Sequence, residues 1–247
     1  MRDGVSKETA DVKDHIVKSY DQELLSLDRK VAQMGGLVER LLAQAFDAME
    51  KRDPQLAEAT SASDAAVDSL ERELQEHAIL MIAKRQPLAH DLRQVMTALK
   101  IAGDLERAGD LGKNIAKRAL AVSGENHPKS LITGLKHMVE LALSQLKDVL
   151  DGYAERDAEK AVAVWRRDER IDAMYNSLFR ELLTYMMEDP RNIGVCTHLL
   201  FAAKNIERIG DHTTNIAENI YYLVHGVALA DDRPKSDDTA SMLIRKE

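Results

Sequence analysis

Apolar residues recur at intervals of three and four along most of the chain, the spacing that lines one face of an α-helix. This pattern predicts a first helix over about residues 20–51. Asp53 and Pro54 follow it, a pair typical of the N-cap and first residue of a new helix. The apolar positions that define the first helix include Leu24, Leu27, Val31, Met34, Val38, Leu41, Leu42, Ala45 and Met49.

Proline residues separate the helices that follow. Pro87 and Pro190 each interrupt a long amphipathic stretch, because proline cannot continue a helix. With these stops, the pattern predicts five further helices, over about residues 54–85, 88–120, 131–155, 158–187 and 193–224.

The second half of the chain repeats the first with an offset of about 101–104 residues. The segment DLERAGDLGKNIAKR at 104–118 aligns with NIERIGDHTTNIAEN at 205–219, and Asp157 takes the place of Asp53. Three helices with short connections favour antiparallel packing in a bundle. We therefore predict an all-α protein of two tandem three-helix bundles, six long helices in all, related by a pseudo-twofold internal repeat. The expected parts are a flexible N-terminus over 1–17, bundles over 18–122 and 128–226, and a disordered polar tail over 227–247.

Composition supports a helical protein and excludes several functions. Aromatic residues make up only 4% of the chain, and its net charge of −8 offers no basic surface for nucleic acid. The single cysteine, Cys196, excludes an internal disulfide and any site with several cysteine ligands. The N-terminus has no signal-peptide pattern, and no apolar stretch approaches membrane-spanning length. We expect a cytoplasmic protein that could dock on a membrane partner.

Acidic residues spaced four apart are the most unusual local feature. Such a pair shares one helix face, and like charges at this spacing destabilise an isolated helix by a few tenths of a kcal/mol, about 0.2–0.5. One pair would mean little, but the spacing occurs at equivalent places in both repeats. The pairs are Asp64 with Asp68, Glu106 with Asp110, Asp168 with Asp172, and Glu207 with Asp211.

Counting from the prolines predicts that these pairs face each other. Asp68 lies 19 residues before Pro87, and Glu106 lies 19 residues after it. In an antiparallel hairpin they lie at the same level, and the second repeat shows nearly the same register about Pro190. Each hairpin should therefore gather four carboxylates.

A cation would remove the repulsion within such a cluster. Two unit charges about 4 Å apart repel by about 4 kcal/mol at an effective dielectric of 20. Oxygen ligands suit hard ions, and four carboxylates exceed the needs of one divalent ion. We expect a multinuclear site of iron, manganese or magnesium in each repeat. The predicted ligands are Asp64, Asp68, Glu106, Asp110 and Asn114 in the first repeat, and Asp168, Asp172, Glu207, Asp211 and Asn215 in the second.

The alternative interpretation is a solvated acidic face, which long helices normally carry. Arg107 and Arg208 could then neutralise neighbouring acids. His212 has Leu111 as its counterpart in the first repeat, so we place it outside the shared ligand set. No nucleophile with a paired base occurs, and the Glu-x-x-His motif of di-iron oxidases is absent, so the sequence does not support catalysis.

Several motifs resemble those of the PhoU family of phosphate-signalling regulators. They are RQPLAHDLRQV at 85–95, the ERxGD motifs at 106–110 and 207–211, NIA at 114–116 and 215–217, SYDQEL at 19–24 and VAQMGGLVE at 31–39. The similarity covers about residues 15–226. It implies two three-helix bundles, each with a metal cluster on its E(D)xxxD pairs, and all eight of those positions are filled here.

The resemblance also implies a function that spacing alone does not reach. It implies a non-enzymatic negative regulator of the phosphate-starvation response, often a homodimer, peripherally associated with the membrane through its partners. Those partners would be a Pst-type ABC phosphate transporter and a PhoR-type sensor kinase. The alternatives are a structural helical repeat protein without a regulatory role and, third, a helical metal hydrolase that activates water on its metal.

Overall fold

The computed structural model describes residues 4–125 and 129–230, and within them every regular element is helical. The first repeat contains α1 (Gly4–Lys51), α2 (Pro54–Ser63), α3 (Ala65–Arg85) and α4 (Ala89–Ala121). The second contains α5 (Lys129–Glu155), α6 (Ala158–Arg166), α7 (Glu169–Glu188), the short 3₁₀ helix η1 (Pro190–Asn192) and α8 (Ile193–His225). The prediction of an all-α fold built from two helical repeats is confirmed.

The second and fifth predicted helices are each divided near the first aspartate of their acidic pair. The break between α2 and α3 falls at Asp64, and that between α6 and α7 at Arg167 and Asp168. The backbone of Asp64 and Asp168 stays in the right-handed helical region, and each carbonyl accepts hydrogen bonds from the amides three and four residues later. Each break is therefore a slight corner rather than a loop, and a smooth apolar periodicity does not reveal it.

Capping interactions set the starts of α2 and α6. The Asp53 carboxylate accepts hydrogen bonds from the backbone amides of Gln55 and Leu56, both at 3.0 Å, and Pro54 is the first helical residue. Asp157 accepts from the Lys160 amide at 3.0 Å in the same way. The sequence prediction for these two caps is confirmed.

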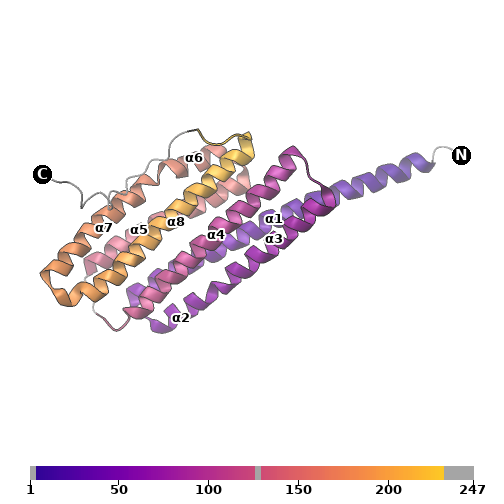
Figure 1. Ribbon diagram of the computed structural model, residues 1–247. Helices are drawn as coiled ribbons and strands as arrows, with labels where there is room; N and C mark the ends of the chain where they lie inside the picture. The colour runs from indigo at the N-terminus through magenta and orange to yellow at the C-terminus, as the bar shows by residue number, and fades with distance from the viewer. Residues whose placement is uncertain (1–3, 126–128, 231–247) are drawn as a thin grey trace.

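The first helix begins at Gly4, whereas the apolar pattern predicted a start near residue 20 with a flexible segment before it. Residues 5–19 contain no proline or glycine, so nothing in the sequence stops the helix from extending toward the N-terminus. Figure 1 shows this part of α1 projecting beyond the turn between α3 and α4. The predicted tail over 227–247 falls mostly outside the described residues.

The two repeats pack against each other through equivalent helices. α4 lies against α8, and α1 against α5 (Figure 1). Both pairs run antiparallel. The contacts of Asp104 with His212 and of Arg118 with His198 show this for α4 and α8. The contacts of Asp28 with Tyr153 and of Glu50 with Lys136 show it for α1 and α5. Such pairing of equivalent helices gives the pseudo-twofold relation expected from the internal repeat.

One hydrophobic core runs through both repeats. Leu27, Leu105, Leu135 and Ile206 all belong to it and are essentially fully buried. The bundles are thus not packed as separate bodies, and the shared core holds the acidic hairpins in fixed positions. In the part of the chain that the structure describes, no helix combines the length and apolar character needed to cross a bilayer.

Candidate functional site

The first acidic cluster lies where the corner between α2 and α3 faces α4. Asp64 at the corner has a side chain only 2% exposed, and Lys113 of α4 donates hydrogen bonds to it and to Asp110. The Lys113 Nζ lies 2.7 Å from Asp64 Oδ2 and 3.0 Å from Asp110 Oδ1. The structure therefore brings Asp64 and Asp110 to one level of the hairpin.

The second acidic cluster is more deeply buried. Asp168, Asp172 and Glu207 are all buried, whereas Asp64 is the only buried member of the first set of four. Lys204 of α8 lies with its Nζ 2.9 Å from Glu207 Oε2. The same sequence spacing thus produces a less hydrated group of carboxylates in the second repeat.

Two equivalent glycines let the corner aspartates approach the opposite helix. A Cβ atom at Gly109 would lie 3.0 Å from Asp64 Oδ1, and one at Gly210 would lie 3.1 Å from Asp168 Oδ1. Any larger residue would press on these carboxylates. The glycine in each ERxGD motif therefore has a packing role that links the motif to the aspartate across the hairpin.

Burial dominates the electrostatics of both clusters. It raises the pKa of Asp64, although the nearby Lys113 ammonium lowers it in part. Burial also raises the pKa of Glu207, against the opposing effect of Lys204, and the charges of Asp211 and Asp172 raise it further. The charged form of each group is therefore held at a cost in free energy, which additional positive charge would relieve.

Glu106 and Asp68 complete the first cluster on its more exposed side. Burial raises the pKa of Glu106, the neighbouring Arg107 lowers it, and the charges of Asp110 and Asp68 raise it. Arg107 Nε lies 3.5 Å from Glu106 Oε2. The four first-repeat carboxylates predicted to face each other are thus close enough to influence one another.

The two asparagines predicted as ligands have different surroundings. Asn114 is exposed on α4. Asn215 donates a hydrogen bond at 3.2 Å to Asp104 Oδ1 across the junction between α4 and α8. The role of both asparagines as metal ligands therefore stays a prediction.

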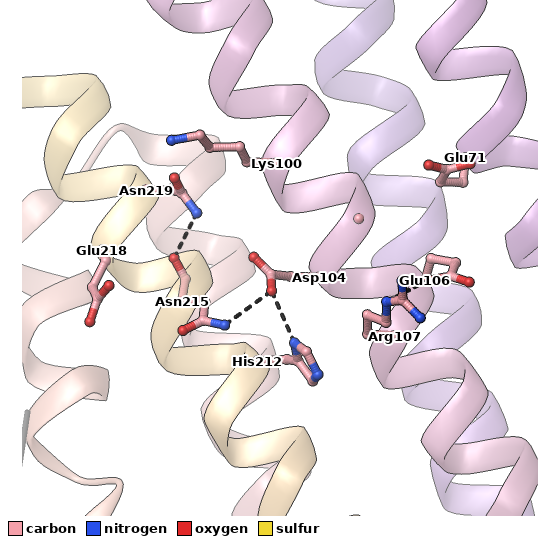
Figure 2. A pocket seen from close by; sticks show the side chains of 10 residues that line it. Glu71, Lys100, Asp104, Glu106, Arg107, His212, Asn215, Glu218 and Asn219 are labelled. Atoms are coloured by element: carbon pink, nitrogen blue, oxygen red, sulfur yellow. Dashed lines mark hydrogen bonds and ion pairs between the residues drawn. The ribbon is translucent and has the colours of Figure 1, made fainter.

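A polar groove of about 610 Å³ lies beside this junction, and sequence reasoning did not find it. Asp104 Oδ1 lies 3.0 Å from His212 Nδ1 and also receives the hydrogen bond from Asn215 (Figure 2). Glu106 and Arg107 line the same groove, which therefore borders the first acidic cluster. Asp104 and His212 are 108 residues apart, so no local pattern in the sequence could have paired them.

The clusters provide donors suited to a hard metal ion, but not a ready-made coordination shell. Among the described residues, no three His, Cys, Asp or Glu side chains are placed to hold an ion together. Two observations nevertheless fit a metal. The donors are all oxygens, and buried Asp64 Oδ1 has no hydrogen-bond partner within the described chain. The ammonium groups of Lys113 and Lys204 lie beside buried acids of the two clusters. Of the two arginines that the sequence suggested, Arg107 lies beside Glu106 on the more exposed side of the first cluster.

Comparison with known proteins gives a consistent result over nearly the whole chain. The family model described as the PhoU domain matches twice, at residues 31–119 and 135–220. A protein of Rhizobium meliloti, the phosphate-specific transport system accessory protein PhoU homolog, is 56% identical over 228 residues, which are 92% of this chain and 96% of that protein. The Escherichia coli phosphate-specific transport system accessory protein PhoU is 40% identical over 212 residues, 86% of this chain and 88% of the relative.

Solved structures agree with these sequence matches. The crystal structure of PhoU from Pseudomonas aeruginosa is similar with a TM-score of 0.81 and 36% identity, over 84% of this chain and all of that one. The phosphate transport system regulatory protein PhoU from Streptococcus pneumoniae gives a TM-score of 0.78 and 29% identity, over 85% of this chain and 99% of that one. The similarity therefore covers both repeats and both acidic clusters.

Proposed function

Since the chain belongs to the PhoU family, we propose that it is an accessory and regulatory protein of a Pst-type ABC phosphate transporter. In this role it couples the transporter to a PhoR-type sensor kinase and acts as a negative regulator of the phosphate-starvation response. When phosphate is plentiful, the kinase is held in its inactive or phosphatase mode. The observation that carries this proposal is the match along the chain to relatives named as accessory proteins of phosphate-specific transport.

The proposed location and assembly follow from this role. We place the protein in the cytoplasm, peripherally associated with the membrane through its partners, and we expect a homodimer. Its relatives are named as accessory or regulatory proteins rather than as enzymes, and we propose no catalytic activity. The long helices of the fold would serve as a docking scaffold.

Metal binding at the two acidic clusters is part of the same proposal. The carboxylates that would hold iron, manganese or magnesium are those of the four acidic pairs. A bound ion would supply positive charge that relieves the burial and repulsion that raise the pKa of Asp64 and Glu207. The residues themselves present an acidic surface, and its charge would differ between the loaded and metal-free protein.

Gene deletion tests the regulatory role. We expect phosphatase-type starvation genes to be expressed in high phosphate when the gene is deleted, and to be silenced again by the wild-type protein. A strain that also lacks the sensor kinase should not show this expression. Unchanged expression in the single deletion would contradict the regulatory role and favour a structural helical repeat protein.

Elemental analysis of gently purified protein tests the metal sites. We expect bound metal in the wild type and its loss in a variant that replaces one acidic pair of each cluster by alanine, at Glu106, Asp110, Glu207 and Asp211. A control variant removes four exposed carboxylates elsewhere, at Glu58, Glu76, Glu125 and Glu188. Equal, negligible metal in all three proteins would contradict metal binding.

A further inference from the structure

We propose that each acidic cluster contains its own competitor for metal, a lysine whose ammonium group lies among the carboxylates until a metal ion displaces it. The lysine is Lys113 in the first cluster and Lys204 in the second. This inference rests on the metal binding proposed above. It adds that metal uptake is an exchange of one cation for another, so that the two lysines determine how much metal is needed to load the protein.

The first lysine bridges the hairpin. Its Nζ contacts Asp64 at the corner between α2 and α3 and Asp110 on α4, at 2.7 and 3.0 Å. The Asp64 side chain is 2% exposed and that of Lys113 is 29% exposed. The ammonium group therefore neutralises a desolvated carboxylate from a position that retains access to water.

The second lysine makes an equivalent arrangement with different neighbours. Lys204 Nζ lies 2.9 Å from Glu207 Oε2 on its own helix and 5.0 Å from the centre of the Tyr175 ring, which belongs to α7. An aromatic face adds attraction for a cation at this distance. The side chain is 37% exposed, so it too can leave the cluster without crossing the core.

The two lysines do not occupy equivalent positions in the repeat. Lys113 comes three residues after Asp110, and its counterpart in the second repeat is Thr214. Lys204 comes three residues before Glu207, and its counterpart in the first repeat is Gly103. The first cluster thus takes its ammonium group from a residue after its acidic pair on the helix, and the second cluster from a residue before its pair. A lysine at two different repeat positions indicates that the carboxylates themselves need a cation, and that the lysine was not simply copied with the repeat.

Exchange is physically reasonable because the two cations differ in charge and reach. A metal ion brings at least two positive charges and binds several oxygens at once, whereas an ammonium group brings one charge on a flexible stem. The lysine stabilises the metal-free cluster and contributes nothing to the loaded one. Its removal should therefore tighten metal binding while it destabilises the metal-free protein.

Calorimetric titration of the full-length protein with Mn²⁺ provides the test. We expect Lys113→Met and Lys204→Met each to bind Mn²⁺ about tenfold more tightly at the affected cluster, and each to melt at lower temperature in EDTA. The control is Lys136→Met, which removes a lysine paired with Glu50 outside the clusters. It should leave the Mn²⁺ affinity unchanged.

Gly103→Lys tests the same inference in the opposite direction, by adding a lysine to the first cluster. Its result does not depend on whether Lys113→Met and Lys204→Met fold. A Cβ at Gly103 meets nothing within 4 Å, and this position is the first-repeat counterpart of Lys204. A lysine there should weaken Mn²⁺ binding at the first cluster about tenfold, whereas Gly103→Ala should not.

The outcomes separate this inference from the metal proposal. The exchange would be overturned, and the metal sites left in place, if the wild type binds Mn²⁺ but neither Lys113→Met nor Lys204→Met tightens that binding. Mn²⁺ binding that Gly103→Lys leaves unchanged would have the same meaning. The absence of Mn²⁺ binding in the wild type and in every variant would overturn both. Tighter binding in the methionine variants together with weaker binding in Gly103→Lys would support the exchange.

Discussion

The two acidic clusters place carboxylates at equivalent repeat positions in unequal environments. In the first, only Asp64 is buried, whereas Asp168, Asp172 and Glu207 are all buried in the second. The second corner is also held from α5, where Gln145 donates a hydrogen bond at 3.0 Å to the Arg167 carbonyl. Repetition of a sequence pattern therefore reproduces the hairpin, while the packing around each hairpin determines how strongly its charges are desolvated.

The shared core predicts that both repeats unfold together. Leu105 and Ile206 occupy equivalent, essentially fully buried positions, so Leu105→Ala and Ile206→Ala should each reduce the free energy of unfolding by about 2–5 kcal/mol. Differential scanning calorimetry should show a single transition that either substitution lowers. Two transitions, each sensitive to only one substitution, would show that the repeats are energetically independent.

The glycines beside the corner aspartates should respond alike in both repeats. Alanine normally stabilises a helix by up to about 1 kcal/mol relative to glycine. At Gly109 and Gly210, however, the new methyl would press on Asp64 and Asp168, and overpacking costs about 1–3 kcal/mol. We expect net destabilisation of about 1 kcal/mol for both variants in urea unfolding. Gly103→Ala, in open space, should stabilise, and stabilisation by all three would contradict the proposed close packing.

Neutralising equivalent glutamates should reveal the difference in burial. Glu207→Gln should stabilise the metal-free protein at pH 7 more than Glu106→Gln, because the Glu207 side chain is 5% exposed and the Glu106 side chain is 26% exposed. Burial raises the pKa of both groups in the folded state above their pKa in the unfolded chain. Each ionised carboxylate therefore destabilises the fold at neutral pH, and this cost disappears once the pH falls below the pKa of the unfolded chain. Unfolding in EDTA should therefore show the advantage of both variants at pH 7 and its loss near pH 4. An equal gain for both at pH 7 would argue against the difference in desolvation.

The smallest expected effect concerns His198, whose first-repeat counterpart is Thr97. Burial and the charge of Arg118 lower the pKa of His198, and Arg118 Nη1 lies 3.5 Å from its Nδ1. Because the pKa of His198 is lower in the folded state than its ordinary value near 6.5 in the unfolded chain, the fold has its full stability above about pH 6.5. That stability falls as the pH drops toward the pKa of the folded state. His198→Gln should make the melting temperature less sensitive to acid between about pH 7 and 5. An unchanged slope would contradict this role.

Much of the fold could be predicted because its signals are local. Apolar spacing, Asp53 with Pro54, and the two interrupting prolines are properties of neighbouring residues, so they indicated the helices and several of their ends. The repeat then indicated which acids should face each other, because antiparallel helices joined by short turns place residues equally far from a turn at one level. The slight corners at Asp64 and Asp168 escaped prediction because they leave the apolar periodicity intact.

The amino-acid sequence alone was sufficient to predict the helical segments, the internal repeat and which acidic residues form pairs. Tertiary packing decided what surrounds those pairs. It determined which carboxylates are buried, that Lys113 and Lys204 lie beside them in addition to Arg107, and that Asn215 turns toward Asp104. The physical reason is that helical periodicity specifies the face on which a residue lies. Its hydration and its ion partners depend on side chains that other helices bring from distant parts of the chain.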